Sequence, residues 1–210
     1  NLARQVVAGD LMLGPGLYFV SPFYIYFLAA GLAAFESFTA VRVLQAALGT
    51  VAVASVFFCA RAWFGPRAAW CAAVLPAATG IFTFYETVII QSSIDAVLAA
   101  GALAVLTAGL RGTAARSSAA AFVFVGTLLR FGILNRPNMF FGVLAVVLAA
   151  MTMRRWRAAM LVVAGVGLGI APVIVRNVSV TGELGLTSSH GGLNLYIGNN
   201  AGATGFYREV

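Results

Sequence analysis

Charged side chains are rare in this 210-residue chain, and a few of them stand where an apolar helix should have none. Thr87, Gln91, Ser92 and Asp95 fall on one face of a predicted helix that runs inward from Glu86. A carboxylate about 13 Å below the helix end must face the bundle interior, a cavity or a partner. The alternative to a role in chemistry is a structural ion pair, or a neutral carboxyl bonded to a neighbouring helix.

Two arginines form a second candidate site. Arg130 and Arg136 fall at the outer end of their helix, against the rule that basic residues gather on the cytoplasmic side. Arginine binds phosphate through paired N–H donors, so a lipid phosphate is the natural anion there. Snorkelling, or pairing with Glu86 or Asp95, is the alternative. We expect Asp95 and Arg130 to form an intramembrane polar pair on adjacent helices, because their counted depths are similar.

The polar tail after Arg176 offers many neutral hydrogen-bonding groups beside aromatic rings, a chemistry suited to carbohydrate. An ordinary turn-rich loop is the alternative. We expect the tail to fold back over the mouth of the bundle, with a short extended segment at 193–197, and to approach Glu86 and Arg136. The tail residues predicted to bind the sugar or the acceptor are His190, Asn194, Tyr196, Asn199 and Asn200.

No group of His, Cys and carboxylate residues has the spacing of a metal site. The sequence therefore predicts no metal ligands and identifies no cofactor, and a divalent metal stays open. Cys59 and Cys71 lie in apolar stretches, which indicates buried thiols in place of a disulfide.

The elements that must position these residues are membrane helices. With 61% hydrophobic and 9% charged residues, the chain could not cover a soluble domain with polar groups. Segment 17–35 carries Pro22 among many Tyr and Phe residues, which favours an interfacial or re-entrant helix over a true span. Six segments are long enough, or nearly so, to cross the bilayer: 40–60, 68–85, 87–110, 117–134, 138–153 and 158–175.

The predicted fold is an all-α, polytopic transmembrane helix bundle. An extracytoplasmic loop and an interfacial helix occupy 1–39, the six-helix bundle occupies 40–176, and an extracytoplasmic C-terminal tail occupies 177–210. All 13 basic residues are Arg. Loops on one side carry Arg and no acid, which predicts that this side is cytoplasmic. The arginines of these loops are Arg61, Arg67, Arg111, Arg116, Arg154, Arg155 and Arg157.

The partners follow from the same pattern. Because the arginines form no patch with interleaved aromatic residues, nucleic acid is not expected as a partner. Membrane lipids are expected partners, and further membrane proteins stay open. The predicted location is the bacterial inner membrane, crossed several times.

An ordered set of short motifs resembles one family of membrane enzymes. Ser21-Pro22-Phe23-Tyr24-Ile25-Tyr26-Phe27-Leu28, Phe84-Tyr85-Glu86 and Arg136-Pro137-Asn138 resemble successive motifs of GT-C membrane glycosyltransferases. The likeness is to the bacterial branch related to dolichyl-phosphate-mannose–protein mannosyltransferases. The most specific match is Arg176-Asn177 followed by Gly192-Leu193-Asn194-Leu195-Tyr196-Ile197-Gly198-Asn199-Asn200.

The resemblance implies an enzyme that moves a sugar from a polyprenyl-phosphate donor to an acceptor on the extracytoplasmic face. It implies catalytic roles for Glu86 and, as a weak substitute, Asp10, and donor phosphate binding by Arg130, Arg136 and Arg176. The family's principal catalytic carboxylate would fall before Asn1, so the chain looks like a fragment. A non-catalytic helical subunit, or a degenerate homologue in a larger membrane complex, is the rival interpretation.

Overall fold

The chain folds into a bundle of helices. The computed structural model describes residues 2–112, 115–200 and 202–203, and every regular element among them is helical. The helices are α1 (Leu2–Val7), α2 (Pro22–Phe35), α3 (Phe38–Phe64), α4 (Pro66–Ala78), α5 (Gly80–Thr87), α6 (Ser92–Arg111), α7 (Ala115–Asn135), the 3-10 turn η1 (Pro137–Met139), α8 (Phe140–Thr152), α9 (Trp156–Thr181) and α10 (His190–Asn199).

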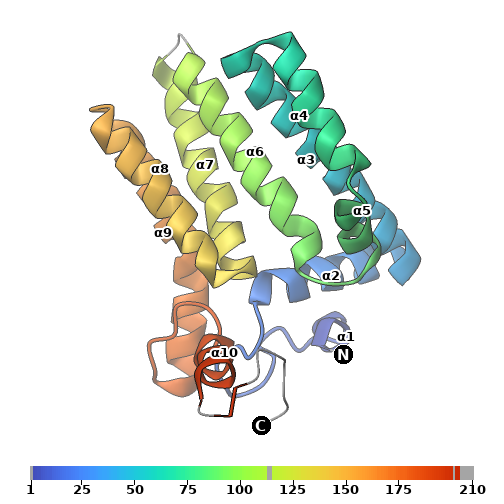
Figure 1. The fold of residues 1–210 in the computed structure, drawn as a ribbon. Helices are drawn as coiled ribbons and strands as arrows, with labels where there is room; N and C mark the ends of the chain where they lie inside the picture. Colours follow the sequence, from blue (N-terminus) through green and yellow to red (C-terminus); the bar gives the residue numbers. More distant parts are fainter. Residues whose placement is uncertain (1, 113–114, 201, 204–210) are drawn as a thin grey trace.

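The long helices run side by side, and α2 lies across one end of the bundle (Figure 1). Within the described residues, three helices are long and apolar enough to cross a membrane: α3, α6 and α9. Shorter apolar helical stretches occur at Pro22–Phe35, Ala119–Asn135 and Pro137–Thr152. The predicted all-α membrane bundle is therefore confirmed.

Small residues allow the central helices to approach closely. On α7 and α9, Gly126 faces Gly165 so tightly that a Cβ on Gly165 would lie 2.6 Å from the Val123 carbonyl oxygen. Around this contact Val125, Val162 and their neighbours form the main apolar core. The close contact through Gly126 and Gly165 thus joins α7 to α9.

One break divides the predicted span 68–85, and another shortens the predicted span 87–110. Pro76 has no N–H for the helical ladder, and Thr79 is extended, so segment 68–85 divides into α4 and α5. A second break separates Thr87, the last residue of α5, from Ser92, the first of α6. Thr87 and Asp95 therefore do not share one helix, and the predicted single polar stripe from 87 to 95 is wrong.

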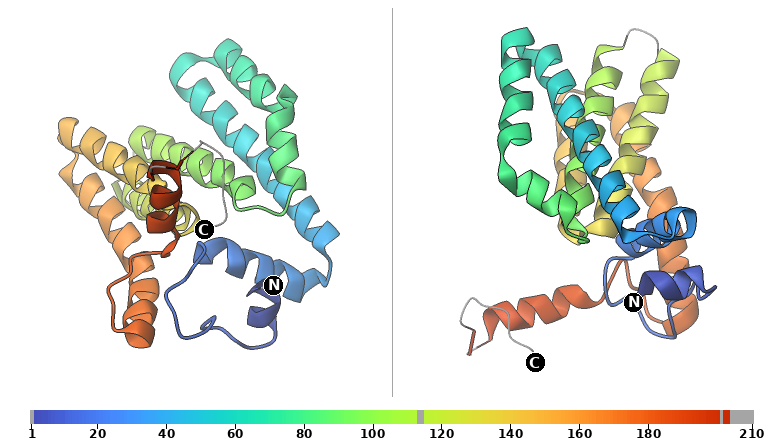
Figure 2. Two further views of the ribbon diagram at one scale, coloured as in Figure 1. Left: turned by 60° about the horizontal axis from the view of Figure 1, so that its bottom comes forward. Right: turned by 90° about the vertical axis from the view of Figure 1, so that its right-hand side faces the viewer.

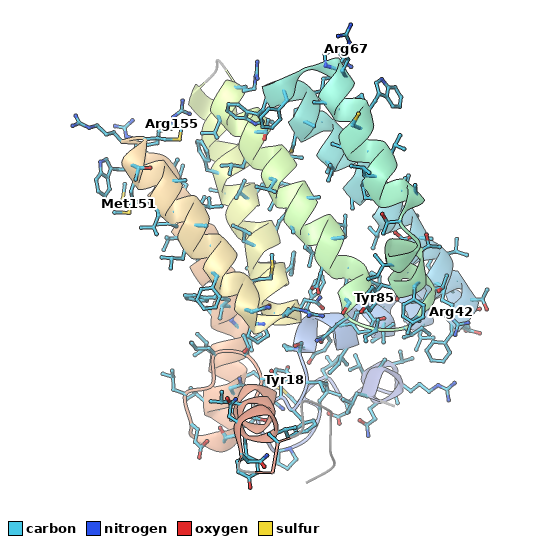
Figure 3. The ribbon with its side chains drawn as sticks, in the orientation of Figure 1. Tyr18, Arg42, Arg67, Tyr85, Met151 and Arg155 are labelled. Atoms are coloured by element: carbon cyan, nitrogen blue, oxygen red, sulfur yellow. The ribbon has the colours of Figure 1, made fainter. Side chains whose placement is uncertain are left out.

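The two ends of the bundle differ in chemistry. Arg67 and Arg155 extend from one end, and Tyr18 and Tyr85 lie toward the other (Figure 3). Arg67 and Arg155 belong to the Arg-rich loops that the sequence places together, whereas Arg42 of α3 lies beside Tyr85 at the other end (Figure 3). The candidate polar residues described below lie toward the end marked by Tyr85.

The tail folds back only in part. Ser189 donates its backbone N–H to the Tyr18 carbonyl, and the buried Asn177 side chain bonds the Gly185 and Thr187 carbonyls. Beyond this loop, α10 packs against no other described helix and extends away below the bundle (Figure 2). The predicted extended segment at 193–197 is wrong, because these residues belong to α10. Apolar residues at 193, 195 and 197 fit a strand, but 193 and 197 also lie about one helical turn apart, so a pattern this short does not distinguish the two.

Candidate functional site

An ion pair joins the start of α6 to the end of α7. Arg136 Nε lies 2.8 Å from Asp95 Oδ2, and Arg136 Nη2 donates to Ser92 Oγ at 2.5 Å. Asn135, fully buried, donates from Nδ2 to Asp95 Oδ1 at 2.6 Å and to the Gln91 carbonyl at 2.9 Å. The Arg136 side chain is 38% exposed, and partly exposed pairs contribute only about 0–1 kcal/mol. The network therefore positions these groups more than it stabilises the fold.

Gln45 fixes the break between α5 and α6. Its fully buried side chain donates from Nε2 to the carbonyls of Glu86, at 2.9 Å, and Val88, at 3.0 Å. Its Oε1 accepts from the Tyr24 hydroxyl of α2 at 2.8 Å. Irregular backbone in a membrane protein needs such partners, because no water is there to satisfy it. Gln45 thus fixes the position of the Glu86 backbone along the bundle axis.

The Glu86 carboxylate lies directly against Gly49 of α3. A Cβ on Gly49 would fall 1.7 Å from Glu86 Oε1, so only glycine leaves room for this carboxylate. Among the described residues nothing donates a hydrogen bond to the Glu86 carboxylate oxygens. Glu86 lies outside the three spanning helices, and its burial raises the pKa of the carboxyl above the ordinary 4.5. A partly desolvated carboxylate with open acceptors has the properties of a general base.

Glu86, Asp95 and Arg136 line one polar cavity of about 460 Å³. Carboxylates and an amide can hold sugar hydroxyls, and an aromatic face can hold a sugar ring. Arg136 Nη1 has no partner among the described residues, so it can still donate to an anion. The remaining lining residues are Tyr85, Ser92, Ser93, Ala96, Ala99, Asn138 and Met139.

Residues 20–178 match the family described as dolichyl-phosphate-mannose-protein mannosyltransferase. The chain belongs to this mannosyltransferase family. The match covers every residue that lines the cavity, and it includes α2 to α8 in full and most of α9. No curated protein and no solved structure matches the chain.

Within this mannosyltransferase-family chain, three of the predicted site residues come together: Glu86, Asp95 and Arg136. The predicted partner of Asp95 is wrong, because its ion pair is with Arg136 and not with Arg130. The sequence predicts that this helix begins at residue 87, five residues before the observed start of α6 at Ser92. Asp95 therefore lies in the first turn of α6, nearer the helix end than predicted. In the antiparallel pair of α6 and α7, that turn lies level with Arg136. Acid in a first turn is also favoured by the helix dipole.

Arg130 lies between α7 and α9, away from the residues that line the polar cavity. Its guanidinium carbon is 4.2 Å from the centroid of the Phe131 ring, and its side chain fills the space above Gly169 of α9. Its Nε is buried without a hydrogen-bond partner among the described residues. The structure therefore separates Arg130 from Arg136, although the sequence analysis assigned both to one donor phosphate.

Arg176 and Asp10 hold the N-terminal loop. Arg176, 6% exposed, donates to the carbonyls of Met12, Gly14 and Gly16, and stacks 4.2 Å from the centroid of the Tyr18 ring. Asp10 accepts from the backbone N–H groups of Met12 and Leu13. Neither Arg176 nor Asp10 lines the polar cavity. Their contacts are those of loop anchors.

The tail side chains that the structure describes do not line the cavity. Asn199 and Asn200 bond carbonyls of α10 itself, and Tyr196 is 57% exposed. The side chains of His190 and Asn194 lie outside the described residues. The predicted sugar-binding loop is therefore not assembled against Glu86 by the residues that can be placed.

Sequence reasoning missed the residues that hold the site together. Gln45, Asn135 and Tyr24 make the connections that place Glu86 and Arg136, and Gly49 provides the space. One signal was available, because a Gln inside an apolar helix needs a buried partner. The identity of that partner is a long-range fact that no local pattern contains.

Proposed function

We propose that this chain carries the donor site of a membrane glycosyltransferase that moves a sugar from a polyprenyl-phosphate donor to an acceptor. The family assignment supports glycosyl transfer. The single observation that carries the proposal is the polar cavity in which Glu86 and Arg136 lie together. Arg136 Nη1 would stabilise the departing phosphate, and Glu86 would accept the proton of the acceptor hydroxyl.

The position of the cavity in the bundle supports transfer on the extracytoplasmic face. It lies toward the end opposite Arg67 and Arg155, and basic loops face the cytoplasm in membrane proteins. We further propose the bacterial inner membrane as the location. Single cysteines at Gly65 and Gly112 should be protected from an impermeant maleimide in intact cells, and one at Gly198 should react. The reverse pattern would put the site in the cytoplasm.

Transfer can be tested with the complete protein in nanodiscs and a polyprenyl-phosphate-mannose donor. Glu86→Gln should slow turnover by about 10²–10⁴-fold, the usual contribution of a general base. Glu183→Gln changes an exposed carboxylate outside the cavity and should leave turnover unaltered. Arg136→Ala should weaken donor binding far more than acceptor binding, whereas Arg155→Ala, also exposed, should change neither. Wild-type activity in Glu86→Gln would remove Glu86 from catalysis, and an inactive wild type would favour the non-catalytic subunit.

A further inference from the structure

The turn between α8 and α9, at the end of the bundle opposite the polar cavity, concentrates positive charge. Arg154, Arg155 and Arg157 occupy three of four consecutive positions, and all three residues are exposed. Among the described residues, no carboxylate forms an ion pair with any of them. The next acid along the chain, Glu183, lies beyond the far end of α9. The charge that balances these arginines must therefore come from outside the described part of the chain.

The turn itself is closed by backbone hydrogen bonds alone. The Arg154 N–H donates to the Met151 carbonyl at 2.9 Å, and the Arg155 N–H donates to the Ala150 carbonyl at 2.8 Å. Arg154 has a φ of 55°, the left-handed conformation that commonly ends a helix. Because the turn needs none of the guanidinium groups for its own structure, all three stay available for a ligand.

The shortness of α8 brings this turn to the level of the lipid headgroups. Helix α8 has 13 residues, and together with η1 it extends about 25 Å, less than the roughly 30 Å of the hydrocarbon core. Figure 1 shows that the turn lies short of the turn between α3 and α4 along the bundle, and Arg155 likewise lies short of Arg67 (Figure 3). A span shorter than the bilayer thins it locally and draws the flanking charges toward the headgroups.

Apolar side chains beside the arginines have the composition of a membrane interface. Trp156 is 56% exposed and Met153 is 54% exposed. Tryptophan gathers at the boundary between headgroups and acyl chains, because its ring is apolar and its N–H is polar. The other two tryptophans of the chain, Trp63 and Trp70, belong to α3 and α4 on either side of their turn at the same end. The arginines thus stand beside groups that face lipid and not bulk water.

We propose that the α8–α9 turn binds the headgroup phosphate of an anionic phospholipid. Arg154, Arg155 and Arg157 hold the phosphate oxygens through their N–H donors, and Trp156 and Met153 lie against the upper acyl chains. The preference is for an anionic lipid, because a zwitterionic headgroup would bring its own ammonium to three guanidinium groups with no carboxylate to receive it. None of these five residues lines the polar cavity, so the site is separate from the one proposed for glycosyl transfer.

Trp156 reports directly on lipid bound at the turn. Brominated phosphatidylglycerol or brominated phosphatidylcholine is exchanged into phosphatidylcholine nanodiscs that hold the complete protein, and the quenching that Trp156→Phe removes is the share of Trp156. Phosphatidylglycerol should bind more tightly by about fivefold or more, the gain expected from one arginine near an anionic surface. Excess inorganic phosphate should not relieve the quenching. Equal quenching by the two lipids would overturn the proposal, and relief by phosphate would assign the site to a soluble anion.

Two matched double variants test the arginines. Arg155→Gln with Arg157→Gln should reduce the preference for phosphatidylglycerol to below about half its wild-type value. Arg61→Gln with Arg67→Gln also removes two exposed arginines from the same end, but from α3 and α4, and should leave the preference at Trp156 unchanged. An equal loss in both variants would show a general attraction of this end for anionic lipid and would refute a site at the α8–α9 turn.

A second measurement keeps every arginine in place. Benzoylphenylalanine replaces either Met153, at the turn, or Phe141, which is 75% exposed near the opposite end of α8. After irradiation in nanodiscs of mixed phosphatidylglycerol and phosphatidylcholine, crosslinks from position 153 should be enriched in phosphatidylglycerol. Crosslinks from position 141 should match the composition of the membrane. The same lipid ratio at both positions would refute the site.

Discussion

Gly49→Ala offers the sharpest test of the site, because it adds one methyl group at the position of a carboxylate. The new Cβ would lie 1.7 Å from Glu86 Oε1 and 2.4 Å from its carboxyl carbon, so the Glu86 side chain must leave its present position. The displaced atoms are the end of a flexible side chain, and a strained rotamer costs about 0.5–1.5 kcal/mol. Alanine gains about 1 kcal/mol of helix propensity over glycine. The free energy of unfolding should therefore change by less than about 1 kcal/mol.

Activity should respond much more strongly than stability. Misplacement of a reacting group by about 1 Å can cost about 10²-fold in rate, and we expect Gly49→Ala to slow transfer by about that factor. The assay is turnover with a polyprenyl-phosphate-mannose donor, together with thermal unfolding of the same samples. Gly101→Ala is the matched control, because its Cβ would meet only Leu128 Cδ1 at an ordinary 3.7 Å.

A double mutant identifies the route of the effect. If Gly49→Ala acts by displacing the Glu86 carboxylate, it should cost nothing further in a Glu86→Gln background. Turnover in Gly49→Ala within about twofold of wild type would refute the reasoning. So would an equal further loss in the double mutant, because the methyl group would then act elsewhere.

Four further outcomes follow from the structure. Because burial raises the pKa of Glu86, and a base acts only when ionised, turnover should fall as the pH drops through that raised pKa, and Glu86→Gln should lose this limb of the pH–rate profile. The same shift should make folding slightly less favourable as the pH rises through it, measurable as unfolding against pH. Gly165→Ala should destabilise by about 1–3 kcal/mol, because its Cβ meets backbone that cannot move aside, whereas Gly167→Ala, with nothing within 4 Å, should not; thermal unfolding of the pair decides this. Arg176→Met should leave the loop carbonyls unpaired and lower the free energy of unfolding by at least about 2 kcal/mol. Limited proteolysis should then cut the loop around Gly14. A loop as resistant to protease as in the wild type would show that Arg176 does not anchor it.

The local pattern of the sequence determined the class of fold. Apolar runs of about 20 residues can only be membrane helices, and Arg in short loops marks one end of the bundle, because both features depend on transfer between water and lipid and not on partners far along the chain. The same logic singled out Glu86, Asp95 and Arg136 as groups too polar for their surroundings.

Tertiary structure decided which of these residues meet. The start of α6 depends on Gln45, which bonds the backbone carbonyl of Glu86, 41 residues later in the chain. Because α6 begins at this point, Asp95 forms its ion pair with Arg136 and not with Arg130. Arg176 and Arg136 are the same residue type, yet one is surrounded by backbone carbonyls and the other borders a cavity. Such assignments could not be read from the sequence, because hydrogen bonds and cavities form between helices distant along the chain, whereas hydropathy and spacing report only on each helix alone.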